Sequence, residues 1–213
     1  MAIFIENAPE QVLAAAKELL DKGLVEGTSG NISARQEDGN IAITPSSLDY
    51  RIMELEDIVV VNPAGEVVAG DKAPSSEKYL HLACLAAYED IAVVIHSHAV
   101  HATMFAVAQQ DIPSCIDEFT VYLGGDIRCT QYAPSGSAEL GEQTVKALEN
   151  RGAALIANHG MVAVGTTMHK AMHNTALVER SAKIIWGAKQ LGAIHPLPEK
   201  VNANFAGVYP YMR

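Results

Sequence analysis

The residues with the clearest chemical potential are two histidines that end an apolar run in the middle of the chain. His96 and His98 follow the run 91–95, with Ser97 between them. Such a run is typical of a buried strand, where residues i and i+2 face the same side, so both imidazoles are expected to point the same way. Two neighbouring neutral imidazoles make half of a divalent-metal site, and they suit zinc. The alternative is a strand end whose polar side chains emerge into water.

A third histidine and an acid stand beside other predicted element ends. His159 follows the short apolar run 153–157. Together with His96 and His98 it could form a set of three ligands that leaves one metal position open, which is the pattern of catalytic zinc. Glu77 opens the helix before the histidine strand and could serve in proton transfer. A glutamate there commonly only complements the helix dipole, so that interpretation also stands.

Three loops rich in glycine, serine and threonine could hold an anion. They cover 27–33, 44–47 and 74–76. Tight turns expose backbone N–H groups, and hydroxyls add further hydrogen-bond donors. Taken alone, the loop at 27–33 is better explained as a plain turn before a strand. Beside a metal ion, however, the three loops could hold a phosphate.

The other histidines and the cysteines give weaker signals. His101 is expected at the rim of the pocket or in the core rather than on a metal. His169 and His173 are spaced as i and i+4, which permits a metal pair on a helix, but no acidic partner completes the pattern and a packed or solvated face is favoured. The three cysteines form no CxxC pair, and their odd number fits a reducing compartment.

The elements that must position these residues alternate along the chain. Strands are predicted at 32–34, 41–43, 58–61, 66–69, 91–96, 127–132, 153–157 and 161–164. Helices are predicted over 8–22, from 74–77 through Leu85, over 99–108, through Leu140 to Leu148, and over about 167–191. Residues 112–122 show no clear pattern. Alternating helices together with hairpins predict a mixed or antiparallel sheet covered by helices.

Length and charge narrow the functional class. The 213 residues suffice for one domain, 1–213, with a C-terminal tail from about 193 that wraps over the surface. The net charge of −10 argues against general nucleic-acid binding or attraction to an anionic membrane. The first residues lack the basic segment of a secretory signal, and no apolar stretch reaches the length of a membrane span. We therefore expect a cytoplasmic protein without a nucleic-acid or membrane partner.

Five motifs in order carry a resemblance to a known family. They are Gly-Thr-Ser-Gly-Asn-Ile-Ser at 27–33, Thr-Pro-Ser at 44–46, Pro-Ser-Ser-Glu at 74–77, His-Ser-His-Ala-Val-His at 96–101 and Asn-His-Gly at 158–160. Together they resemble the class II aldolase/adducin-head family over about residues 8–192, with sugar-phosphate aldolases looking closest. The resemblance implies a three-layer α/β/α fold with a central, largely antiparallel sheet. It also implies a homotetramer with active sites between subunits.

The resemblance assigns roles to individual residues. His96, His98 and His159 would hold one zinc ion (Zn2+) per chain, and Glu77 would be the acid/base and a zinc ligand in the resting site. The residues implied to hold the phosphate are Gly30, Asn31, Ser46, Ser47, Ser75 and Ser76. The implied reaction is reversible cleavage of a ketose 1-phosphate, such as L-fuculose 1-phosphate, to dihydroxyacetone phosphate and a short hydroxyaldehyde. Zinc would stabilise the enediolate as a Lewis acid, and Glu77 would transfer the proton at C3.

Two departures concern the aldehyde half of the substrate. Aldolases of this family place a tyrosine, donated to a neighbouring subunit, after the Ile-Pro that corresponds to 112–113, whereas here residues 116–118 fall in that region. The proton donor to the aldehyde oxygen stays open among Asp117, Glu118, Tyr122, Tyr209 and Tyr211. Ser135 stands where the family has an aromatic residue, which suggests a more open aldehyde side.

Other functions are compatible with the same motifs. A pentulose-phosphate 4-epimerase or a methylthioribulose-phosphate dehydratase of the family would use a similar metal site. A non-enzymatic, adducin-like interaction module is a different class, and such modules lack the metal histidines. Because all three histidines and Glu77 are present, the aldolase is the favoured prediction.

Overall fold

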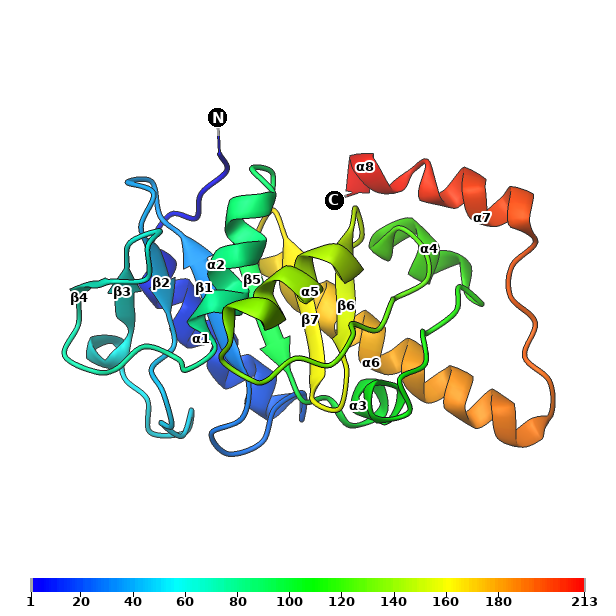
Figure 1. Cartoon of the computed structure of the whole chain (residues 1–213), viewed down its shortest axis with the longest axis horizontal. Helices are drawn as coiled ribbons and strands as arrows, with labels where there is room; N and C mark the ends of the chain where they lie inside the picture. The colour runs from blue at the N-terminus through cyan, green and yellow to red at the C-terminus, as the bar shows by residue number, and fades with distance from the viewer. Residues whose placement is uncertain (1, 213) are drawn as a thin grey trace.

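The structure, a computed structural model, describes residues 2–212 and is built on a seven-stranded sheet (Figure 1). The strand order is β4-β3-β2-β1-β5-β7-β6, and all neighbouring strands pair antiparallel. The strands are β1 (Asn31–Arg35), β2 (Ile41–Ile43), β3 (Val59–Val61), β4 (Val67–Ala69), β5 (Val93–Ser97), β6 (Ala153–Ile156) and β7 (Gly160–Gly165). The expected largely antiparallel sheet is confirmed.

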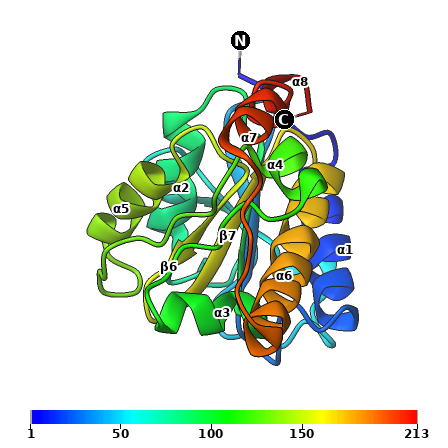
Figure 2. The same cartoon turned by 90° about the vertical axis from the view of Figure 1, so that its right-hand side faces the viewer.

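Helices cover both faces of the sheet and make three layers (Figure 2). One face carries α2 (Lys78–Ala87) and α5 (Ala138–Leu148), and the other carries α1 (Ala8–Asp21), α3 (Val100–Val107) and α6 (Met168–Leu191). The central strand β5 is buried on both sides because Val93 and Ile95 pack with the second group of helices, while Val94 packs with the first. This alternation also turns His96 toward the α2 face.

Two segments differ from the sequence-based expectations. The predicted strand 127–132 is wrong, because residues 127 and 129 form only isolated bridges. The ladder with β6 stops where the Thr130 hydroxyl accepts the N–H of Ala157, and the N–H of Cys129 is taken by the Asp111 carboxylate. Residues 112–122, which showed no clear pattern, include all but the last residue of α4 (Asp117–Leu123).

The C-terminal tail runs along α4 and forms α7 (Glu199–Ala206) and α8 (Tyr209–Met212) (Figure 1). Two hydrogen bonds attach the tail to the rest of the chain. The N–H of Leu197 donates to the Ser114 carbonyl, and the Thr120 hydroxyl donates to the side-chain oxygen of Asn202. Both views place α4, α7 and α8 at the end of the sheet opposite α3 (Figures 1 and 2). Within residues 2–212, the structure contains no helix with the length and apolarity to cross a bilayer.

Candidate active site

Three histidines meet at the end of the sheet where β5 ends and β7 begins. His96 lies on β5, His98 follows that strand, and His159 lies in the tight turn between β6 and β7. The Nε2 atoms of His96 and His98 are 2.9 Å apart, and one ring nitrogen from each of the three side chains lies within 4.8 Å of the others. His96 and His98 therefore point the same way, as expected, and His159 points toward them.

The backbone fixes which nitrogen of His96 faces the cluster. Its Nδ1 is 2.9 Å from the Met161 carbonyl, which can only accept, so Nδ1 carries the proton and Nε2 presents a lone pair. Gly160 makes the close packing possible, because a Cβ at this position would lie 2.5 Å from the Ser97 carbonyl oxygen and 3.0 Å from the His98 ring. A glycine after His159 is thus needed to bring the rings together.

Glu77 is the N-cap residue of α2, and its carboxylate reaches the cluster. Oε2 is 3.3 Å from His96 Nε2, and Oε1 is 3.4 Å from His159 Nε2. The carboxylate is 6% exposed and accepts hydrogen bonds from Asn31 Nδ2 and Ser135 Oγ, each at 2.9 Å. A glutamate that only complemented the helix dipole would point into solvent, whereas this one is held among three histidines.

The charge states follow from burial and hydrogen bonding. Burial lowers the pKa of His96 to about 3 and also lowers the pKa of His98, so both rings are neutral at neutral pH. Burial alone would raise the pKa of Glu77, but a positive charge on His96 and the hydrogen bonds from Asn31 and Ser135 lower it. Since His96 is neutral at pH 7, we attribute the ionisation of Glu77 there to the hydrogen bonds.

The donor set fits a divalent metal. Neutral imidazoles with a fixed tautomer are the form in which histidine binds metal, and an ionised carboxylate within reach can add a ligand or transfer a proton. Three histidine donors leave at least one coordination position for substrate, which is the catalytic arrangement. The described residues therefore could hold a metal ion at this point.

The hydroxyl-rich loops gather beside Glu77. The loops 44–47 and 73–76 are joined, because Ser75 N–H donates to the Thr44 carbonyl and Ser46 N–H donates to the Ala73 carbonyl. Ser75 is buried and its hydroxyl accepts the Glu77 N–H, while Ser47 and Ser76 are exposed. In the first loop, the Gly30 carbonyl accepts the Tyr50 hydroxyl at 2.8 Å. Five of the six residues expected to hold phosphate thus lie on these loops, and the sixth, Asn31, begins β1 and donates a hydrogen bond to Glu77.

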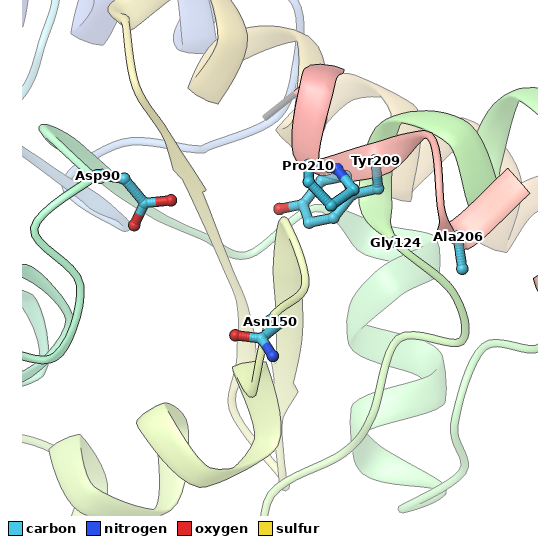
Figure 3. Close-up of a pocket in the computed structure, with 6 residues that line it drawn as sticks. All are labelled: Asp90, Gly124, Asn150, Ala206, Tyr209 and Pro210. Atoms are coloured by element: carbon cyan, nitrogen blue, oxygen red, sulfur yellow. The ribbon is translucent and has the colours of Figure 1, made fainter.

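The residues considered as proton donors to the aldehyde lie elsewhere. Asp117, Glu118 and Tyr122 belong to α4, where Glu118 pairs with Arg180 and the Tyr122 ring contacts His173 at 4.7 Å. The Tyr209 ring packs on Gly124 at a hollow also lined by Asp90, Asn150, Ala206 and Pro210 (Figure 3). This is the end of the sheet opposite the histidines. The side chain of Tyr211 lies outside the described part of the structure.

Sequence reasoning missed two partners of the site, His81 and Ser33. His81 Nε2 is 2.5 Å from Asn31 Oδ1, and its Nδ1 is 2.8 Å from Ser33 Oγ. The signal was present in the spacing, because Glu77 and His81 are four residues apart near the start of a helix and Asn31 and Ser33 alternate on a strand. Among the described residues, the other weak candidates do not join a metal-ligand cluster. His101 pairs with Glu179 at 2.7 Å, and His173 packs on Tyr122.

The three-layer fold and the histidine–carboxylate site together define a class II aldolase-like enzyme. Comparison with known proteins gives the same result, since residues 10–186 match the family described as "Class II Aldolase and Adducin N-terminal domain". The chain belongs to this family. The histidines and Glu77 are those of the enzymes of the family rather than of adducin-like modules, and the aldolase-named relatives support lyase activity.

Three relatives illustrate the range of named activities. A 5-deoxy-D-ribulose 1-phosphate aldolase of Bacillus thuringiensis serovar kurstaki is 32% identical over 96% of this chain and 96% of its own. An L-ribulose-5-phosphate 4-epimerase of Salmonella paratyphi C is 34% identical over 92% of this chain and 91% of its own. Among solved structures, an L-fuculose 1-phosphate aldolase has a TM-score of 0.92, 33% identity and 98% coverage of both chains.

Proposed function

We propose that this protein catalyses the reversible, zinc-dependent aldol cleavage of a ketose 1-phosphate to dihydroxyacetone phosphate and a short hydroxyaldehyde. The observation that carries the proposal is the Glu77 carboxylate, which lies 3.3–3.4 Å from Nε2 of both His96 and His159. In this proposal His96, His98 and His159 hold the metal, and Glu77 is both a ligand in the resting site and the acid/base. A bound zinc ion would supply Lewis acidity to the substrate oxygens as charge develops.

The chain's own residues handle binding and the proton. The loops with Gly30, Asn31, Ser46, Ser47, Ser75 and Ser76 hold the phosphate through backbone N–H groups and hydroxyls. In the condensation direction, ionised Glu77 removes a proton from C3 of dihydroxyacetone phosphate. In the cleavage direction, the electrons of the C3–C4 bond pass into the enediolate, and Glu77 returns a proton to C3. The hydrogen bonds from Asn31 and Ser135 aim the carboxylate and keep it ionised between turnovers.

Two relatives support a proposal for the substrate class. The names 5-deoxy-D-ribulose 1-phosphate aldolase and L-fuculose 1-phosphate aldolase share a ketose 1-phosphate whose terminal carbon lacks a hydroxyl. Ser135 stands where the family has an aromatic residue, and its smaller side chain leaves more room for the aldehyde half of the substrate. We therefore propose a deoxyketose or pentulose 1-phosphate.

The assembly completes the proposal. The described candidates for the proton donor to the aldehyde lie on α4 and α8, which both views place at the end of the sheet opposite α3 and therefore away from the cluster of His96, His98 and His159 (Figures 1 and 2). We propose that a neighbouring subunit of a homotetramer contributes the donor from α4 or from the tail. The same proposal treats residues 1–213 as one domain with a tail from about 193.

The direct test is a panel of sugar phosphates. L-Fuculose 1-phosphate, L-ribulose 1-phosphate and 5-deoxyribulose 1-phosphate are each incubated with the zinc-loaded protein, and L-ribulose 5-phosphate is incubated separately. Stoichiometric dihydroxyacetone phosphate from a ketose 1-phosphate supports the aldolase. Because one relative is named as an epimerase, D-xylulose 5-phosphate from the last substrate without triose from any of the others would overturn the proposal in favour of a 4-epimerase.

A further inference from the structure

We infer that His81, a residue outside the histidine cluster, positions the acid/base: it fixes the side-chain amide of Asn31, which in turn holds Glu77 toward the metal histidines. The inference rests on the proposed function of Glu77. His81 is fully buried on α2, and its ring bridges Asn31 and Ser33 on the neighbouring strand β1. No other role for this imidazole follows from its surroundings.

The hydrogen bonds that link Ser33, His81, Asn31 and Glu77 can have only one direction of donation. An ionised carboxylate only accepts, so Asn31 must turn its Nδ2 toward Glu77 Oε2. Asn31 Oδ1 then faces His81 and can only accept a hydrogen bond, so His81 Nε2 carries the hydrogen and donates it. His81 Nδ1 is left as an acceptor, and the Ser33 hydroxyl donates to it. The sequence Ser33, His81, Asn31, Glu77 is therefore a chain of donors that ends on the carboxylate.

The environment keeps His81 in this form. Burial lowers the pKa of His81 to about 4, so the ring is neutral at neutral pH and has a single N–H. That N–H lies on Nε2 because Ser33 and Asn31 fix the tautomer. Without it, the amide of Asn31 could flip, and Oδ1 would face the Glu77 oxygen across 2.9 Å. Two oxygens that can only accept repel each other, and the carboxylate would move away from the cluster.

Asn31 also links the acid to the phosphate side. It follows Gly30 in the loop proposed to hold phosphate, and its Nδ2 has a second hydrogen besides the one given to Glu77. An amide held in one orientation can serve Glu77 and the substrate together. His81 would thus set the geometry on which both depend, although it contacts neither.

Two substitutions of similar polarity separate positioning from packing. In His81→Gln the side-chain nitrogen reaches the place of Nε2 and can still donate to Asn31. In His81→Asn the shorter amide reaches only the place of Nδ1 and Ser33. We expect His81→Asn to lower kcat by about tenfold or more and His81→Gln to stay within about threefold of the wild type, since a hydrogen bond that orients a charged group has an effect of this size. Both variants should lose thermal stability alike and retain zinc.

A second measurement needs no variant. Nitrogen-15 NMR of histidine-labelled, zinc-loaded wild type reports the tautomer of each ring, and His81 should show a protonated Nε2 and an unprotonated Nδ1. The opposite tautomer, an imidazolium, or equal loss of kcat in both variants would overturn the inference. If wild type cleaves no ketose phosphate and exchanges no C3 proton of dihydroxyacetone phosphate, the proposed function fails instead, and the NMR result still decides the hydrogen-bond chain.

Discussion

At one end of the sheet, the Glu77 carboxylate lies within 3.4 Å of ring nitrogens of two of the three clustered histidines, and Asn31 donates a hydrogen bond to it. The Met161 carbonyl fixes one of these two rings. At the other end, α4, α7 and α8 meet through packing, with the Tyr209 ring against Gly124 (Figure 3). The first end has its chemistry assembled within one chain. The second end carries the tyrosines and acids considered as proton donors to the aldehyde, and it lies opposite the histidine cluster of the same chain (Figures 1 and 2).

Under the proposed function, this difference predicts that two subunits contribute to different steps. Proton exchange at C3 would need only Glu77 and a metal ion held by the three histidines, all of which belong to one chain. Cleavage also needs a group that manages the proton on the aldehyde oxygen. Substitutions at the two ends of the sheet should therefore affect different steps.

The largest effect is expected from the metal histidines. His98→Ala or His159→Ala removes one of three imidazole donors, and we expect loss of zinc and at least about a thousandfold loss of cleavage, equivalent to roughly 4 kcal/mol of Lewis-acid stabilisation. Metal analysis and triose release measure both. His101→Ala is the matched control, because His101 pairs with Glu179 outside the cluster, and it should keep its metal. Full zinc content and turnover in all three of His96→Ala, His98→Ala and His159→Ala would mean that the site is elsewhere.

The next effect separates the acid/base from the metal. Glu77→Gln keeps the shape of the side chain and removes the base, so exchange of the C3 proton of dihydroxyacetone phosphate with deuterated solvent should fall by at least about a hundredfold. Zinc should remain bound by the three histidines. Unchanged exchange with a modest loss of stability would instead support a helix-capping role for this glutamate.

The opposite end of the sheet should show the reverse pattern. Asp117→Asn, Glu118→Gln, Tyr122→Phe and Tyr209→Phe are made singly. At least one variant should lower the cleavage rate by about tenfold or more, because it removes an acid/base group. The rate of C3 proton exchange should stay at the wild-type value. If these four variants and Tyr211→Phe all cleave normally, the aldehyde proton is managed at the histidine end, and the proposed contribution of a second subunit is wrong.

The smallest effect concerns the packing of the tail. Gly124 has a φ of +86°, and a Cβ there would lie 2.8 Å from the Tyr209 ring, so Gly124→Ala should destabilise the protein by about 1–3 kcal/mol without changing zinc content. Gly187 on α6 has no heavy atom within 4 Å of its ideal Cβ. Gly187→Ala should therefore be neutral or stabilising by up to about 1 kcal/mol. Equal unfolding free energies for the two variants would contradict this packing.

Much of the fold was predictable because periodicity reports burial. Strands such as β2 and β5 and helices α1 and α6 were found within a few residues, since their apolar spacing depends on the sheet face that they cover. The strand at 127–132 failed because side chains, the Asp111 carboxylate and the Thr130 hydroxyl, take the backbone groups that a ladder would need. Local sequence does not reveal such competition from distant residues.

The site was predictable to a similar extent. Motif order was enough to select the three histidines and Glu77, which the structure brings together. The hydrogen bonds from His81 to Asn31 and Ser33 join a strand to a helix about 50 residues later, so they depend on how two elements pack. The proposed role of α4 and the tail could not be derived from the sequence for another reason: their contacts in the proposed assembly would depend on a second chain.

The most direct test of the account is a metal titration of cleavage. The purified protein is stripped by a chelator, titrated with zinc, and assayed for dihydroxyacetone phosphate with the best ketose 1-phosphate. The account predicts no activity without metal and a rate that rises in proportion to bound zinc until about one ion per chain is reached. Full cleavage by the stripped protein, with other divalent metals also absent by metal analysis, would contradict it.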